Sequence, residues 1–95
     1  MHFSVHNIYM KKNLFPENLK SYRRDLNLTL YKISKITGLS RSVLSYYERG
    51  VKTPSLYNLL ILSDFFELSL DDLCTEPFLP FNNEDREKVL KKLKG

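Results

Sequence analysis

The segment 29–50, TLYKISKITGLSRSVLSYYERG, constrains the fold more than any other part of this chain. Its apolar residues recur at helical spacing on both sides of Gly38. Glycine can adopt the left-handed backbone conformation that ends a helix without a steric penalty. The segment therefore predicts two short helices, at about 30–37 and 41–49, joined by a three-residue turn.

Both expected helices have a polar cap and an apolar side. Thr29 and Ser40 stand immediately before them, and both residue types accept hydrogen bonds from the first amide groups of a helix. Gly50 is expected to end the second helix as Gly38 ends the first. The side chains expected to face the core are Ile33, Ile36, Leu44 and Tyr47.

The remainder of the chain from residue 15 is predicted to be helical as well, and no strand is expected there. Further helices are expected at about 16–26, 56–66, 70–74 and 84–94. The helix 56–66 is apolar on nearly all sides, which predicts a central, buried position. The last helix has only a narrow apolar stripe, so it is expected to dock lightly or to contact another subunit.

Ninety-five residues suggest one domain. We expect residues 1–14 to be an N-terminal extension that is strand-like or disordered. Residues 15–76 are expected to form the helical domain. Residues 77–95 are expected to form a loop and a C-terminal helix, with a candidate dimer contact there.

Charge is distributed unequally along the chain, whose net charge is +4. Residues 20–52 contain eight Lys or Arg and two acids, whereas residues 53–79 contain five acids and no basic residue. Such a dipolar domain has one face suited to a polyanion.

Several classes of protein are disfavoured by what the sequence lacks. No run of about 18 apolar residues could span a membrane, and the N-terminus lacks the pattern of a secretion signal. Cys74 is the only cysteine, which excludes an internal disulfide and fits a reducing cytoplasm. His2 and His6 are too few for a metal site. No glycine-rich phosphate loop or catalytic constellation is visible, so we expect no enzyme activity, cofactor or metal.

Residues 19–73 resemble the lambda-repressor-like, Cro- and Xre-type helix-turn-helix domains. The matching residues, in order, are Tyr22-Arg23, Thr29, Ile33-Ser34, Gly38-Leu39-Ser40, Val43-Leu44, Glu48-Arg49-Gly50, Pro54-Ser55-Leu56, Leu59-Leu60 and Leu68 to Leu73. The resemblance implies an all-α, five-helix bundle, here with an extra C-terminal helix. It also implies a buried or half-buried ion pair between Arg23 and Glu48. Leu30 departs from the family, which often has a phosphate-contacting glutamine at this position.

In such a domain the first paired helix crosses the phosphate backbone and the second reads bases in the major groove. The residues expected to contact bases are Arg41, Ser42, Ser45 and Tyr46. Arg41 could bind guanine through its two forked donors or could contact a phosphate instead. The residues expected to contact the DNA backbone are Thr29, Lys32, Lys35, Ser40, Arg49, Lys52 and Thr53.

The resemblance implies a sequence-specific transcriptional regulator, in the first place a repressor, that binds double-stranded DNA as a homodimer. One alternative is an antitoxin or a restriction–modification controller that represses its own operon. A second is a protein-interaction module that has lost DNA binding. The dimer surfaces suggested by the sequence are the short helix at 70–74, the loop 78–81 and the C-terminal helix.

Overall fold

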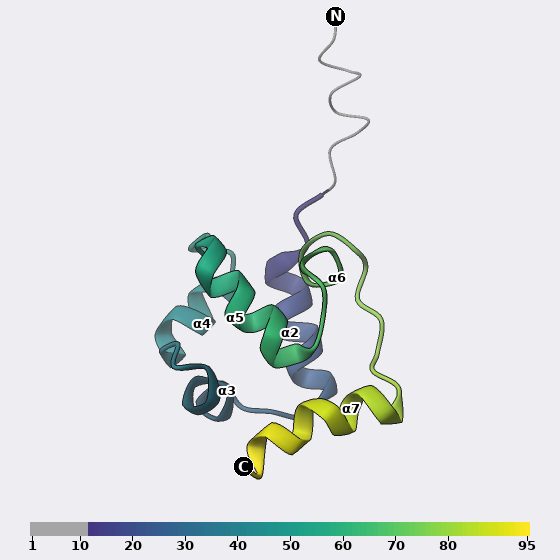
Figure 1. Ribbon diagram of the computed structural model, residues 1–95. Helices are drawn as coiled ribbons and strands as arrows, with labels where there is room; N and C mark the ends of the chain where they lie inside the picture. The colour runs from purple at the N-terminus through teal and green to yellow at the C-terminus, as the bar shows by residue number, and fades with distance from the viewer. Residues whose placement is uncertain (1–11) are drawn as a thin grey trace, which may run out of the picture.

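Helices succeed one another from residue 15 to the C-terminus in the computed structural model, which describes residues 12–95 (Figure 1). The helices are α2 (Phe15–Asp25), α3 (Leu30–Thr37), α4 (Arg41–Glu48), α5 (Leu56–Phe66), α6 (Leu70–Cys74) and α7 (Asn83–Leu90), followed by the 3-10 turn η1 (Lys91–Leu93). The predicted all-α class is confirmed for the described residues. The predictions for residues 1–11, including His2 and His6, lie outside them.

Side-chain caps explain where most of the helices begin. The Oγ atoms of Ser40, Ser55 and Ser69 each accept a hydrogen bond from the amide three residues later, at 3.0–3.1 Å. Thr29 caps α3 in the same way at 3.1 Å, and Asn82 caps α7 at 2.7 Å. These bonds satisfy amide groups that have no partner within the helix.

Two glycines end the paired helices, as predicted. Gly38 follows α3 with φ of +81°, and Gly50 follows α4 with φ of +72°. Left-handed backbone of this kind costs little for glycine and more for residues with a Cβ atom. The turn between α3 and α4 therefore consists of residues 38–40, the length that the sequence predicted.

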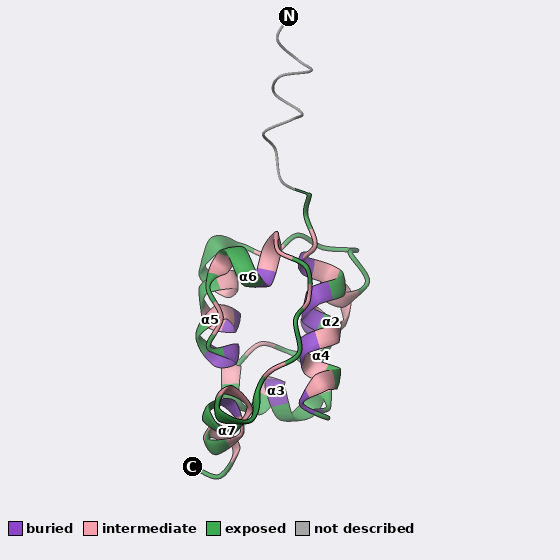
Figure 2. Ribbon diagram, turned by 90° about the vertical axis from the view of Figure 1, so that its right-hand side faces the viewer, coloured by how far each residue is buried: buried purple, intermediate pink, exposed green. Residues whose placement is uncertain are grey.

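The core lies where α2 packs against α4 and α6, and where α5 packs against α3 and α6. Figure 2 shows the buried residues on the inward sides of these helices. The fully buried side chains include Leu19, Ile33, Leu44, Leu62, Phe66, Leu73 and Val89. The predicted core positions Ile33, Leu44 and Tyr47 are confirmed.

Two predictions of burial are wrong. Ile36 is 43% exposed, because three residues of helix rotate its side chain by about 60° from the direction in which Ile33 faces the core. The helix α5 is not buried on all sides, since Leu56, Tyr57 and Leu60 are exposed. Their side of α5 is turned away from α3 and α6, the helices on which α5 packs.

The buried amide of Asn18 joins the two ends of the helical domain. Its Nδ2 donates to the carbonyl oxygens of Leu73 at 3.1 Å and Glu76 at 2.8 Å. A backbone hydrogen bond of 2.7 Å from Leu14 to the Cys74 carbonyl lies beside it. These contacts satisfy carbonyls at the end of α6 that have no helical partner.

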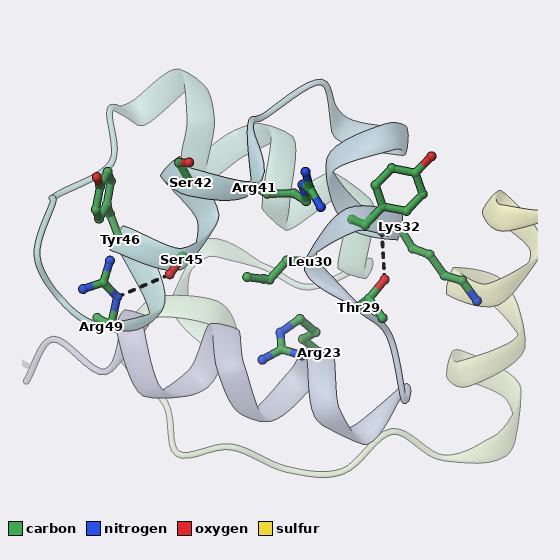
Figure 3. A pocket seen from close by; sticks show the side chains of 10 residues that line it. Arg23, Thr29, Leu30, Lys32, Arg41, Ser42, Ser45, Tyr46 and Arg49 are labelled. Carbon is green, nitrogen blue, oxygen red and sulfur yellow. Dashed lines mark hydrogen bonds between the residues drawn. The ribbon is translucent and has the colours of Figure 1, made fainter.

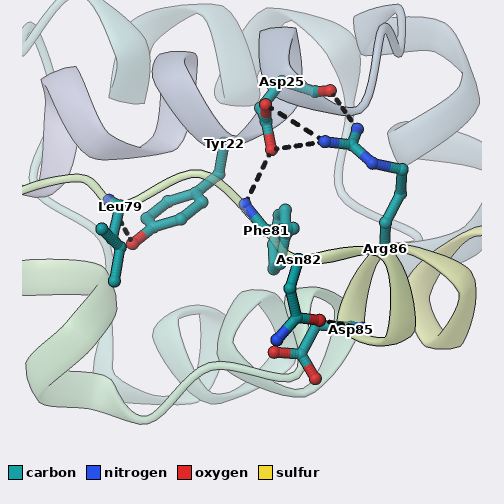
Figure 4. Close-up of polar contacts among 7 residues, drawn as sticks. All are labelled: Tyr22, Asp25, Leu79, Phe81, Asn82, Asp85 and Arg86. Atoms are coloured by element: carbon teal, nitrogen blue, oxygen red, sulfur yellow. Dashed lines mark hydrogen bonds and ion pairs between the residues drawn. The ribbon is translucent and has the colours of Figure 1, made fainter.

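Residues 77–95 fold back over the same core (Figure 4). The phenol of Tyr22 accepts a hydrogen bond from the Leu79 amide at 3.3 Å. The Asp25 carboxylate accepts one from the Phe81 amide at 3.0 Å and pairs with Arg86 at 3.4 Å. Val89 in α7 has no exposed surface. The C-terminal helix is therefore held by polar and apolar contacts together, which is more than its narrow apolar stripe predicted.

Candidate nucleic-acid interface

An open groove of about 1000 Å³ runs between α3 and α4 (Figure 3). The residues that line it are Arg23, Thr29, Leu30, Tyr31, Lys32, Arg41, Ser42, Ser45, Tyr46 and Arg49. Four of these are Arg or Lys and none is Asp or Glu. A concave surface with cations and no carboxylate attracts and concentrates a polyanion.

The structure brings the four expected base-contacting residues together in this groove. Arg41 and Ser42 are exposed at the first turn of α4, and Ser45 and Tyr46 follow one turn later. The Arg49 Nε donates to the Ser45 Oγ at 3.3 Å. The Arg49 guanidinium and the Lys52 ammonium lie 5.1 Å and 4.9 Å from the centre of the Tyr46 ring. This contact holds two cations at one end of the groove.

Tyr31 is a member of the groove that sequence reasoning missed. Its ring is exposed and lies 5.7 Å from the Arg41 guanidinium and 5.6 Å from the Lys35 ammonium. Tyr31 therefore positions the arginine at the start of α4 much as Tyr46 positions Arg49. An aromatic residue on the polar side of a lysine-bearing helix was the available sequence signal.

Only three of the seven residues expected to contact the DNA backbone line the groove. Thr29, Lys32 and Arg49 line the groove, whereas Lys35, Ser40, Lys52 and Thr53 do not. Lys35 and Lys52 nonetheless flank it through their contacts with the two tyrosines. Ser40 and Thr53 are exposed on the turns before α4 and α5.

Leu30 lies in the middle of the groove, as Figure 3 shows. It is half-buried and packs against the core. The centre of the groove is therefore apolar, and the cations stand around it. An apolar side chain cannot hydrogen-bond to a phosphate, but it can contact the methyl group of thymine.

The ion pair implied by the resemblance is present, with Arg23 in the wall of the groove and Glu48 behind it. The Arg23 Nε and Nη2 donate to the two oxygens of Glu48 at 2.6 Å and 3.0 Å, and the Nη1 donates to the Leu28 carbonyl at 3.0 Å. The hydrogen bond to Glu48 raises the pKa of the Arg23 guanidinium. The pair ties α2 to the end of α4, so it fixes how α4 is presented.

Among residues 12–95, no group of three or more His, Cys, Asp or Glu could hold a metal ion. None of the helices in that range has the length and apolar character to cross a membrane.

Two helices joined by a three-residue turn, with a cationic groove beside the second, define the helix-turn-helix class. The helix-turn-helix family model matches residues 19–73, so the chain belongs to this family. The match ends at Leu73, before the segment that carries α7.

The chain is 35% identical over 75 residues to the antitoxin PezA of Streptococcus pneumoniae, a match that covers 79% of this chain and 48% of the antitoxin. It is 33% identical over 64 residues to the control protein C.SmaI of Serratia marcescens, which covers 67% of this chain and 76% of that protein. The chain thus spans about half the length of the antitoxin and about three quarters of the control protein.

A transcriptional regulator from Listeria innocua has a similar solved structure. The TM-score is 0.63 at 24% sequence identity, with 87% of this chain and 78% of the other covered. At this identity the similarity concerns the fold. Because it covers 87% of this chain, it reaches beyond the 55 residues of the family match.

Proposed function

We propose that this protein is a sequence-specific DNA-binding transcriptional regulator, in the first place a repressor, that reads the major groove with α4. The observation that carries the proposal is the groove between α3 and α4, which is lined by cations and contains no carboxylate. The membership of the chain in the helix-turn-helix family supports the same conclusion.

Each groove residue has a proposed role. Arg41 donates through both arms of its guanidinium to guanine, while Ser42, Ser45 and Tyr46 make less selective contacts with neighbouring bases. Thr29, Lys32, Lys35, Ser40, Arg49, Lys52 and Thr53 contact phosphates and fix the register. The amide groups at the starts of α3 and α4 add positive potential toward the phosphates. These roles require binding and no catalysis.

The partner is double-stranded DNA, bound by a homodimer. A single α4 offers few base contacts, and two copies related by a two-fold axis can read two half-sites about one helical turn apart. We also propose that residues 15–76 are the DNA-binding unit and that residues 77–95 support it.

A gel-shift experiment with genomic fragments at about 50 and 200 mM salt tests the proposal. Six or more phosphate contacts would lower the affinity about 10³-fold or more over that range. Retention of the fragments at low salt with this steep loss supports a DNA interface. No retention at either concentration, or a flat salt response, would favour the alternative of a protein-interaction module.

A second candidate function is an antitoxin or restriction–modification controller that represses its own operon. The similarity to proteins named as an antitoxin and as a control protein favours it. A toxin or methylase gene next to the gene for this chain, together with binding to the shared promoter, would distinguish it from a regulator of distant genes.

A further inference from the structure

We propose that a cavity beside the loop 77–82 is a binding site for a small organic cation with an apolar body, such as an arylalkyl ammonium ion. The cavity has a volume of about 650 Å³ and lies between α2, the end of α6, this loop and the start of α7. It shares no lining residue with the groove between α3 and α4. A cavity of this size is within the range that small ligands occupy in proteins.

Three aromatic side chains form the apolar part of the cavity wall, namely Tyr22, Phe78 and Phe81. The centres of the Phe78 and Phe81 rings lie 4.8 Å and 5.3 Å from the centre of the Tyr22 ring. Phe78 and Phe81 are half-buried, so part of each side chain remains accessible. The face of an aromatic ring carries partial negative charge and attracts a cation, while its area contacts an apolar body.

This wall is fixed by hydrogen bonds within the chain. Tyr22 is buried, and its hydroxyl accepts a hydrogen bond from the Leu79 amide at 3.3 Å. The Phe81 amide donates to the Asp25 carboxylate at 3.0 Å, as Figure 4 shows. The loop 77–82 is therefore attached to α2 at two points. A cavity that is already formed loses less conformational entropy on binding than a flexible one.

The charge of the cavity selects a cation. Three of the residues that line it are acidic, Asp72, Glu76 and Asp85, and none is Lys, Arg or His. Asp72 and Asp85 take part in none of the ion pairs formed within residues 12–95. The nearby Arg86 is bound to Asp25 instead. Carboxylates without a cationic partner favour a ligand that brings the positive charge itself.

The Asp72 carboxylate also acts on the aromatic part of the wall. Burial raises the pKa of the Tyr22 phenol more than the hydrogen bond from Leu79 lowers it, and the charges of Asp72 and Asp25 add to the increase. The potential beside the phenol is therefore negative, which disfavours an anionic ligand and favours a cationic one. A ligand with an ammonium group and an aromatic or alkyl body matches both parts of the wall.

An NMR titration of the full chain with three benzyl compounds tests the site. Benzyltrimethylammonium carries a permanent positive charge, benzyl alcohol is neutral and phenylacetate is negative. Benzyltrimethylammonium is expected to shift the amide signals of Phe78, Leu79 and Phe81 saturably. Benzyl alcohol is expected to bind at least about tenfold more weakly, and phenylacetate more weakly still. The experiment contains no DNA, so its outcome does not depend on the proposed function.

Two substitutions that keep the shape of the side chain test the carboxylates. Asp72→Asn and Asp85→Asn are each expected to weaken the binding of benzyltrimethylammonium about threefold or more and to leave that of benzyl alcohol unchanged. The matched control is Asp71→Asn, because Asp71 is exposed, precedes Asp72 and does not line the cavity. If one of the two variants reduces helical circular dichroism, the other provides the test.

Four results would overturn the proposal. The first is the absence of saturable shifts with benzyltrimethylammonium. Equal affinities for benzyltrimethylammonium and benzyl alcohol would mean that the carboxylates select no cation. Equal weakening by Asp71→Asn and Asp72→Asn would reduce the effect to a general attraction by surface charge. A lysine tetrapeptide that shifts the same amides, where benzyltrimethylammonium shifts none, would assign the cavity to a protein partner.

Discussion

Arg23 and Glu48 form a bidentate ion pair, with the Arg23 Nε 2.6 Å from one carboxylate oxygen and the Nη2 3.0 Å from the other. The side chains are 16% and 7% exposed. The third arm of the guanidinium donates to the Leu28 carbonyl. One side chain therefore fixes the end of α2, the entry to α3 and the end of α4.

Replacing Arg23 tests how much this junction contributes to stability. Arg23→Ala leaves the Glu48 carboxylate without its partner in a largely buried site, so we expect the free energy of unfolding to fall by about 3–5 kcal/mol. Urea unfolding followed by circular dichroism measures the loss. The control is Arg24→Ala. Arg24 follows Arg23 in α2 and its side chain is exposed, so this substitution should change the free energy of unfolding by less than about 0.5 kcal/mol. Equal stability of both variants would contradict a structural role for the pair.

Gly38 is expected to be needed for its backbone conformation alone. Nothing lies within 4 Å of the position that a Cβ atom would take, while φ is +81°. Gly38→Ala should therefore cost about 1 kcal/mol or somewhat more through backbone strain. Gly38→Asn should cost less, because asparagine tolerates this conformation better than alanine does. Thermal unfolding measures the melting temperatures of the two variants. If side-chain crowding were the cause, Gly38→Asn would melt at a lower temperature than Gly38→Ala, because asparagine is the larger residue.

Arg41 and Lys32 are expected to affect DNA binding in different ways. If Arg41 reads guanine, Arg41→Ala should relax selectivity at one base pair by about 1–3 kcal/mol. Lys32→Ala should weaken binding to all sequences and reduce the salt slope by about one. Competition between a selected duplex and its single-base variants measures both effects. Loss of affinity without loss of selectivity in Arg41→Ala would assign Arg41 to a phosphate.

The C-terminal helix is expected to contribute to the stability of the helical domain. Val89 is fully buried, so Val89→Ala should lower the free energy of unfolding by about 2 kcal/mol. Glu87→Ala, at an exposed position of the same helix, provides the control. A single unfolding transition that shifts for Val89→Ala is the expected result. An unchanged transition would mean that α7 does not share the core.

Burial raises the pKa of the Cys74 thiol, and the nearby Asp71 charge acts in the same direction. The folded chain thus favours the neutral thiol. The stability contributed by this preference is present below the pKa of the unfolded chain and is lost as pH rises through the higher folded value. Alkylation by iodoacetamide should accelerate at higher pH in the folded chain than in urea.

Asp71→Asn provides a second measurement of the Cys74 pKa. Removing the Asp71 charge should lower the pKa of the Cys74 thiol part of the way toward its ordinary value. The larger part of the increase, which comes from burial, should remain. Coinciding alkylation profiles for the folded and the urea-unfolded chain would contradict the shift.

Individual residues show where sequence reasoning succeeded and where it failed. The boundaries of α3 and α4 were predictable, because Thr29, Ser40 and Gly38 act on backbone groups within a few residues of themselves. The end of the last helix was not, since α7 stops at Leu90 and a 3-10 turn follows. The exposure of Ile36 was not, since periodicity identifies an apolar side but not its exact rotation toward neighbours. Nothing in the sequence indicated that the Asn18 side chain is buried and hydrogen-bonded, because its acceptors at Leu73 and Glu76 are more than fifty residues away.

The sequence by itself determined the helices, their caps, the three-residue turn and the unequal distribution of charge, because all of these depend on neighbouring residues. The tertiary structure alone decided which side of α5 stays exposed, that Tyr31 stands beside Arg41, and that Val89 of α7 is buried against the rest of the chain. Those features arise from contacts between segments far apart in the chain, whose packing no local pattern specifies.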